Sequence, residues 1–305
     1  MLEIITHSCF ADHRVPLGHP ERPDRIRTVW QALDEDFADL PRHDAPKATA
    51  DLVSLVHGSD YYDFIASHEA GDEELRSIDG DTHMGAGSLE AGLRAAGGAV
   101  LGVDRVMRGE AERVFLAARP PGHHAEPDTA MGFCLFSSAA IAAEHARQAH
   151  GLTRVAVVDF DVHHGNGTQA AFWQDGDLLF ASSHQMPLFP GTGSSAETGC
   201  GNIFNAPLRA GTDGGSVVGV WQDYLLPKIA AEKPELIIIS AGFDAHIRDP
   251  LASIEMQAAD FGVLTTLIRQ MAEEVAEGRI VSLLEGGYDL DGLRTSLTAH
   301  LEALR

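Results

Sequence analysis

The amino-acid sequence predicts an α/β fold with three α/β/α layers built around a mostly parallel central sheet. Short apolar runs rich in β-branched residues alternate with longer segments of helical periodicity along the 305-residue chain. Several runs, such as residues 155–158 and 236–239, are apolar at every position, which is typical of strands covered on both faces. No segment has the composition of a linker, so we expect residues 1–305 to form a single domain.

The individual elements follow from these patterns in chain order. Strands are expected where the short apolar runs lie, at residues 2–7, 114–119, 154–163, 178–184, 203–208, 235–244 and 279–286. Helices are expected between them, because parallel strands need a crossover connection, at residues 22–36, 88–108, 138–149, 215–232, 259–277 and 291–304. Residues 69–88, rich in acidic residues and glycine, are expected to form a long, mobile surface loop.

Composition and charge limit the classes of function. The contents of 44% hydrophobic and 22% charged residues are ordinary for a soluble globular protein. The formal net charge of −23 argues against binding to nucleic acid or to an anionic membrane, because the summed field repels phosphate. This charge suits a cationic substrate such as a lysine-rich tail or a polyamine, and it equally suits a surface that only keeps the protein soluble.

Cysteine content and hydropathy bear on the cellular location. The three cysteines, Cys9, Cys134 and Cys200, are too few and too scattered for a disulfide framework. The N-terminal residues do not resemble a signal peptide, and no uncharged apolar run approaches the roughly 20 residues that span a bilayer. We therefore expect a protein of the reducing cytoplasm.

Polar residues follow four of the expected strands at the point where each strand ends. Because ligands bind at the carboxyl ends of strands in such sheets, these side chains should converge at one edge. They are His123 and His124, then Asp159, Asp161 and His163, then Asp244, and finally Tyr288.

Two carboxylates and an imidazole are expected on one face of a single strand. Asp159, Asp161 and His163 share parity, so they point to the same side if that strand stays extended. Like charges so close together need a cation among them. Asp161, His163 and Asp244 would supply three ligands and leave a fourth position for water, as in catalytic zinc sites. The alternative is a structural ion pair or a set of helix caps.

The tandem histidines follow Pro-Pro-Gly, which predicts a tight and rigid turn. Two adjacent imidazoles cannot share one environment, so one of His123 and His124 is expected to act as general base and acid while the other gives electrostatic support. Asp159 and Asn166 are the expected partners of the pair. Tyr288, which follows two glycines, could stabilise an oxyanion, or it could simply pack in a loop.

Seven motifs in chain order resemble the arginase/deacetylase superfamily, and specifically the zinc-dependent class II histone deacetylases and their bacterial amidohydrolase relatives. The motifs are His-Pro-Glu-Arg-Pro-Asp-Arg at 19–25, Arg-Pro-Pro-Gly-His-His-Ala at 119–125, Gly-Phe-Cys at 132–134, Asp-Phe-Asp-Val-His-His-Gly-Asn-Gly at 159–167, Phe-Pro-Gly-Thr-Gly at 189–193, Ala-Gly-Phe-Asp at 241–244 and Glu-Gly-Gly-Tyr at 285–288. Together they span most of the chain.

The resemblance implies a role for each matching residue. Asp161, His163 and Asp244 would bind one catalytic Zn²⁺. His124 would be the general acid and base of the histidine pair, and Tyr288 would polarise the amide carbonyl. The substrate tunnel would be lined by Gly132, Phe133, Phe189, Leu251 and Gly287.

The resemblance also implies features around the catalytic residues. Asp159 would be the partner of His123. The neighbourhood of Asp159 would include a structural K⁺ site with Ser182 as a member, and Arg22 would lie near an internal channel for acetate release.

Departures from the family patterns narrow the expected substrate. Asn166 stands where class I enzymes carry Asp, which favours the class II group. Leu251 stands where polyamine-specific relatives carry Glu, which favours acyl-lysine over acetylpolyamines. Gly165 and His246 replace carboxylates that hold a second metal ion in the ureohydrolase relatives, so a dinuclear site is not expected. The acidic rim position of class I enzymes falls near residues 82–84, and no residue is assigned to it.

These features together predict a zinc-dependent amidohydrolase that deacylates Nε-acyl-lysine in a protein or peptide and releases acetate by attack of a metal-activated water. An acetylpolyamine or other small-amide deacetylase with the same mechanism is the alternative, and a catalytically silent acyl-lysine-binding protein is a more remote one. The expected partner is an acylated protein, peptide or amine, with no nucleic acid and no membrane. The sequence leaves the acyl length, the physiological substrate and the oligomeric state open, a homo-oligomer included.

Overall fold

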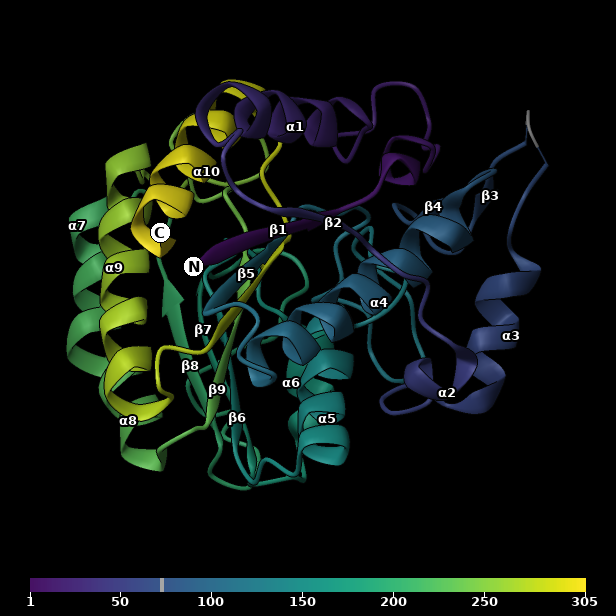
Figure 1. Ribbon diagram of the computed structural model, residues 1–305. Helices are drawn as coiled ribbons and strands as arrows, with labels where there is room; N and C mark the ends of the chain where they lie inside the picture. Colours follow the sequence, from purple (N-terminus) through teal and green to yellow (C-terminus); the bar gives the residue numbers. More distant parts are fainter. Residues whose placement is uncertain (72–73) are drawn as a thin grey trace.

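The computed structural model describes residues 1–71 and 74–305 and contains an eight-stranded sheet between two layers of helices (Figure 1). The strand order is β2-β1-β5-β10-β9-β6-β7-β8, and every neighbouring pair is parallel. The predicted three-layer fold with a mostly parallel sheet is therefore confirmed. The strands are β1 (Leu2–Thr6), β2 (Arg42–Asp44), β5 (Arg113–Leu116), β6 (Val155–Asp159), β7 (Leu178–Gln185), β8 (Ile203–Leu208), β9 (Leu236–Ala241) and β10 (Ile280–Leu284).

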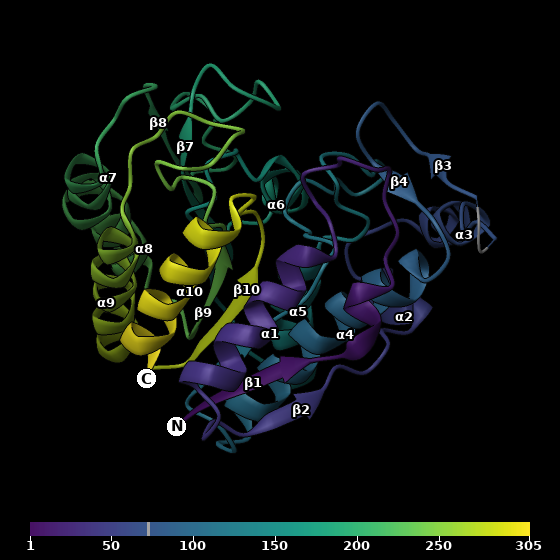
Figure 2. The same cartoon turned by 90° about the horizontal axis from the view of Figure 1, so that it is seen from above.

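Each face of the sheet is covered by its own set of helices, as the view from above shows (Figure 2). One layer contains α1 (Asp24–Asp36), α7 (Gly214–Val220), α8 (Leu226–Glu232), α9 (Ala258–Val275) and α10 (Leu290–Leu304). The other contains α4 (Ser88–Met107), α5 (Ser138–His150) and α6 (Asn166–Phe172). Every residue of β6 and β9 is buried, as expected of strands covered on both faces.

Four strands end earlier than the sequence pattern suggested. The expected strand 154–163 ends at Asp159, and those at 114–119, 235–244 and 279–286 end at Leu116, Ala241 and Leu284. After β6 the backbone N–H of Asp161 donates to the Asp159 carboxylate, and the N–H of His163 donates to the Asp161 carboxylate. These local hydrogen bonds replace those of the sheet, because aspartate side chains compete with strand pairing for backbone donors.

The expected helix 215–232 contains a π-helical turn, Trp221–Leu225, between α7 and α8. Pro227 lies at the start of α8 and has no N–H to continue an α-helical ladder, which accounts for the wider turn before it.

Several short elements had no clear sequence signal. They are β2, the 3₁₀ turn Ser8–Ala11, α2 (Ala50–Val53), α3 (Ser59–Ser67) and α6.

The expected loop 69–88 is only partly irregular. It contains a short antiparallel pair formed by β3 (Arg76–Ser77) and β4 (His83–Met84), and α4 begins at its last residue. Residues 72–73 of this loop lie outside the described residues, and the mobility of the loop stays a prediction. In the described part of the chain, no helix combines the length and the apolar character that crossing a membrane requires.

Candidate active site

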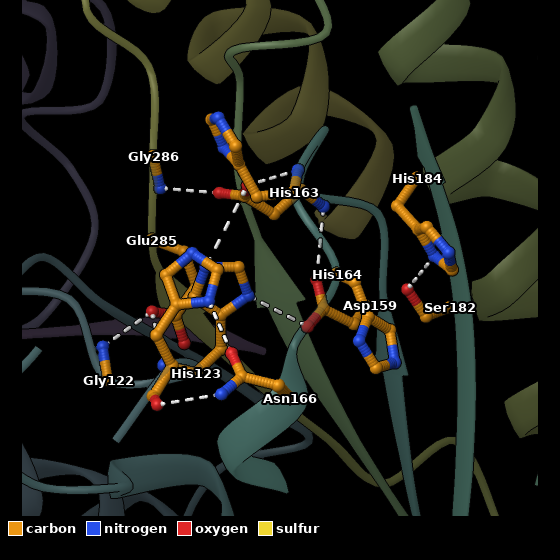
Figure 3. Close-up of polar contacts among 12 residues, drawn as sticks. Gly122, His123, Asp159, His163, His164, Asn166, Ser182, His184, Glu285 and Gly286 are labelled. Carbon is orange, nitrogen blue, oxygen red and sulfur yellow. Dashed lines mark hydrogen bonds and ion pairs between the residues drawn. The ribbon is translucent and has the colours of Figure 1, made fainter. Parts of the chain in front are cut away.

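The four strands that end in polar residues are consecutive in the sheet, in the order β5-β10-β9-β6. Because the strands are parallel, their carboxyl ends meet at one edge, and the residues that follow them converge there (Figure 3). The structure thus brings together all seven polar residues that the sequence placed at these ends.

Asp161, His163 and Asp244 form a buried group of potential metal ligands. One ligand atom from each lies within 4.8 Å of the other two. Nδ1 of His163 is 3.1 Å from Oδ1 of Asp161 and 3.1 Å from Oδ2 of Asp244. A single imidazole proton cannot satisfy two carboxylates well, whereas a divalent cation among the three atoms would. Imidazole and carboxylate are common zinc ligands, so the residues present fit a metal ion.

The charges within this group favour a positive partner. Burial, and next the neighbouring Asp161 carboxylate, raise the pKa of Asp244 to about 7. Burial alone would lower the pKa of His163, but its hydrogen bonds with Asp161 and Asp244 outweigh burial and raise it to about 10. The His163 imidazole thus favours its protonated form between the two carboxylates.

Asp159 is not part of this group of potential metal ligands, contrary to the shared face that strand parity suggested. Because β6 ends at Asp159, the alternation of side chains no longer applies to Asp161 and His163. Oδ2 of Asp159 instead lies 3.0 Å from Nδ1 of His123 (Figure 3). Asp159 is therefore placed as the partner of His123.

The two adjacent histidines lie in opposite electrostatic environments, although their ring centroids are only 3.9 Å apart. Burial disfavours the charged form of His123, but the Asp161 and Asp159 carboxylates overcome this and raise its pKa to about 10. Burial, together with the positive charges of His123 and His163, holds the pKa of His124 well below its ordinary value. His123 thus favours the imidazolium form and His124 the neutral form.

Asn166 fixes the tautomer of His124. The Asn166 side-chain nitrogen donates to Oε1 of Glu126 over 2.7 Å, which orients the amide oxygen toward His124. That oxygen lies 2.8 Å from Nδ1 of His124 and accepts its proton. In the neutral ring, Nε2 is then the unprotonated nitrogen that can act as a base. Glu126 was not identified from the sequence, because its role depends on a contact 40 residues away.

The loop after β5 is held by Glu285, at the end of β10. Oε2 of Glu285 accepts the backbone N–H groups of Gly122 and His123 at 2.7 and 3.2 Å (Figure 3). Burial raises the pKa of this carboxyl to about 7. Glu285 belonged to a motif of the sequence, but nothing there indicated that it anchors the histidine turn.

Tyr288 is held from two sides. Its backbone N–H donates to Oδ2 of Asp249 over 2.7 Å, and Oδ1 of Asp249 accepts the N–H of Leu251. The guanidinium carbon of Arg25 lies 4.9 Å from the centre of the Tyr288 ring. Arg25 also donates to the carbonyl oxygens of Gly287 and Glu285, so it fixes the segment that carries the tyrosine.

A buried network of ion pairs is connected through Arg25 to the segment that carries Tyr288. Glu21 accepts two hydrogen bonds of 2.7 Å from Arg119 and one of 3.1 Å from Arg25, and all three side chains are buried. The sequence resemblance placed Arg22 near an internal channel. The structure instead places its side chain at the surface, 40% exposed and paired with Asp24, and the neighbouring Arg25 points inward.

A cavity of about 220 Å³ reaches His163, one of the three potential metal ligands. Its predicted wall residues Gly132, Phe133, Phe189 and Leu251 all line it, whereas Gly287 is not among the lining residues and points its carbonyl toward Arg25. The remaining lining residues are Asp81, His124, His163, Leu188 and Tyr288. A Cβ on Gly132 would lie 2.5 Å from the His124 ring, so glycine is needed to leave room for the base.

Asp81 and Leu188 were not identified from the sequence as part of this cavity. Asp81 lies one residue before residues 82–84, near which the acidic rim position of class I enzymes falls. The family motifs do not extend into this loop, so the sequence pattern does not identify which residue occupies that position. Burial, and next the nearby Asp79 carboxylate, raise the pKa of Asp81.

Comparisons of sequence and of structure with known proteins point to the same group of relatives. A family model described as the histone deacetylase domain matches residues 19–304. The chain is 40% identical to the histone deacetylase-like amidohydrolase of Pseudomonas aeruginosa, over 89% of this chain and 73% of the relative. It is 36% identical to a probable deacetylase of Archaeoglobus fulgidus, over 95% of this chain and 82% of the relative. The crystal structure of the HDA15 HD domain superposes with a TM-score of 0.92 at 33% identity, over 99% of this chain and 89% of that one.

We predict that Arg25→Gln lowers the free energy of unfolding by about 3 kcal/mol, because it breaks a buried ion pair with Glu21 and leaves two buried carbonyls without their donor. Arg27→Gln on the same helix is the matched control. Arg27 is 59% exposed and forms a surface ion pair with Asp24, so its loss should change stability by less than about 0.5 kcal/mol. Urea unfolding at equal metal content measures both, and equal effects of the two variants would contradict the role of Arg25.

Proposed function

The chain belongs to the histone deacetylase family, and from this premise we propose that it is a zinc-dependent hydrolase that removes acyl groups from the Nε atom of lysine side chains in a protein or peptide. Hydrolysis of an amide is the reaction class that membership of this family gives. The proposal that the substrate is an acyl-lysine rests on the shape and lining of the cavity. Its walls are largely apolar and suit a methylene chain, and it ends at His163, His124 and Tyr288.

Asp161, His163 and Asp244 would hold the zinc ion. When bound there, zinc supplies Lewis-acid polarisation of the substrate carbonyl and makes a water molecule more acidic. The proposal does not depend on a second metal ion, since Gly165 and His246 offer no carboxylate for one.

His124 would move the proton. Its unprotonated Nε2 accepts a proton as water adds to the amide carbon, and the same nitrogen then gives that proton to the leaving amine as the C–N bond breaks. The products are a carboxylic acid, acetate for an acetyl group, and a free lysine amine. Asn166 keeps the tautomer correct throughout, because it holds the proton on Nδ1.

His123 and Tyr288 would stabilise the charge that develops on the carbonyl oxygen. His123, held by Asp159, remains an imidazolium and contributes positive charge to a buried site. The Tyr288 hydroxyl would donate a hydrogen bond to the same oxygen, in the manner of an oxyanion hole. Asp159 accepts the N–H of Asp161, and Asp249 accepts the N–H groups of Leu251 and Tyr288, so the backbone around both donors is held in place.

A structural K⁺ ion near Asp159 is part of the proposal. Asp159 and Ser182 are directly paired in the register of β6 and β7, and both are buried. The Ser182 hydroxyl lies 2.9 Å from Nδ1 of His184. Oxygen ligands of this kind suit a hard monovalent cation. A cytoplasmic location, the absence of nucleic-acid and membrane partners, and a homo-oligomeric state stay predictions from the sequence.

Tyr288→Phe should lower kcat/KM for an acetyl-lysine peptide by about 100- to 1,000-fold, since it removes one oxyanion donor. The exposed Tyr224 offers the matched Tyr→Phe control, which should leave the rate unchanged. Hydrolysis by Tyr288→Phe at the wild-type rate would show that the hydroxyl takes no part in the reaction.

Asp244→Ala should remove one equivalent of zinc per chain relative to wild type and abolish acetate release. Asp223→Ala is the control, because Asp223 is an exposed aspartate on the π-helical turn. Elemental analysis after dialysis at a fixed free zinc concentration measures the first effect. The assignment of the ligand fails if Asp244→Ala keeps the wild-type zinc content.

Leu251 should set the choice between acyl-lysine and acetylpolyamine. We expect kcat/KM for an acetyl-lysine peptide to exceed the values for acetylputrescine and acetylspermidine, because a leucine at the cavity offers no charge to a second ammonium group. Leu251→Glu should shift the ratio toward the polyamines, and Leu251→Gln controls for size. A wild-type preference for acetylpolyamines would favour the small-amide alternative instead.

A further inference from the structure

A second group of metal-ligating side chains lies where the C-terminal ends of α4 and α5 pack together. Asp104 lies in the last turn of α4, and His145 and His150 lie in the last two turns of α5. One ligand atom from each lies within 4.8 Å of the other two. Among residues 1–71 and 74–305, this is the only such group besides Asp161, His163 and Asp244.

The two imidazoles converge on one carboxylate oxygen. Nε2 of His145 lies 2.8 Å from Oδ1 of Asp104, and Nε2 of His150 lies 2.7 Å from the same atom. The other oxygen of Asp104 pairs with Arg108 at 3.0 Å, which leaves Oδ1 to the histidines. The three side chains are 14%, 17% and 21% exposed, so the group is preorganised but open to an ion from solvent.

This group lies at the opposite edge of the sheet from the cavity. α4 leads into β5 and α5 leads into β6, so both helices run antiparallel to their strands (Figure 1). Their C-terminal ends therefore lie at the amino edge, whereas Asp161, His163 and Asp244 follow the carboxyl ends. None of the three residues has a part in the proposed deacylation.

The local electrostatics favour a cation at this place. The macrodipole of a helix places partial negative charge at its C-terminus, and here the C-terminal ends of α4 and α5 meet beside a carboxylate. Arg108 offsets the charge on one side of Asp104 only. A divalent ion between the helices would interact favourably with both dipoles and with the carboxylate.

We propose that Asp104, His145 and His150 bind a divalent transition-metal ion of the zinc class, which cross-links α4 to α5. Two imidazoles and one carboxylate are typical zinc ligands and leave one position for water. Zinc bonds of about 2.0–2.1 Å place tetrahedral ligand atoms about 3.3 Å apart, so each imidazole needs to move back by only about half an ångström. Partly exposed histidines at a helix end can make that adjustment by side-chain rotation.

The zinc content per chain, measured after dialysis against buffered micromolar Zn²⁺, tests this assignment. The control is His68→Gln, because His68 is a partly buried histidine directly after α3. Wild type and His68→Gln should each hold one equivalent of zinc more than His150→Gln and Asp104→Asn. All four proteins should release acetate from an acetyl-lysine peptide at the same rate, because the site lies outside the catalytic machinery. Equal zinc content in the four proteins would overturn the proposal.

Thermal unfolding in the Asp244→Ala background gives an independent measurement. Zinc should raise the Tm of Asp244→Ala by at least about 2 °C through the remaining site, because an ion that binds only the folded state stabilises it. The shift should disappear in Asp244→Ala/His150→Gln and persist in Asp244→Ala/His68→Gln. An equal shift in all three would refute the site. A failure of the deacylation proposal would look different. The wild-type protein would then not hydrolyse the peptide, but it would still hold more zinc than His150→Gln.

Discussion

Buried negative charge at the carboxyl edge of the sheet is the constraint on which the rest of this structure depends. The side chains of Asp159, Asp161, Asp244 and Glu285 are almost completely buried. An isolated carboxylate is very unfavourable in such surroundings, so each must be paired or hydrogen-bonded. Oδ2 of Asp161 accepts the N–H of Gly286, and Oδ1 of Asp244 accepts the N–H of Val162. The turns after the strands therefore take the shape that aims their backbone donors at the carboxylates.

The same constraint explains how adjacent histidines take different roles. His123 faces Asp159, and His124 faces the neutral amide of Asn166. The buried carboxylates raise the pKa of His123, whereas burial and next the positive charge of His123 lower the pKa of His124. The proposed general base, His124, thus lies beside an imidazole that favours its protonated form, although both residues are histidines. The buried Glu21, Arg25 and Arg119 network extends this pattern to the N-terminal segment and fixes the loop that carries Tyr288.

Much of the fold and of the site was predictable from the sequence, because both depend on local patterns. Continuous apolar runs indicated the central strands, and polar residues at their ends indicated the edge where His123, Asp161 and Asp244 meet. The parity of Asp159 with Asp161 and His163 was misleading, since aspartate side chains end β6 by capturing backbone donors. The inward direction of Arg25, and the contact between Glu126 and Asn166, depend on tertiary packing that carries no local signal.

The most direct measurement is anomalous X-ray scattering at the zinc absorption edge from crystals of the zinc-loaded protein. It locates the ion without reference to activity or to the choice of substrate. We predict a peak enclosed by the Asp161 and Asp244 carboxylates and by Nδ1 of His163. No peak at that position in crystals grown with saturating zinc would contradict the view that this buried charge exists to hold a metal ion.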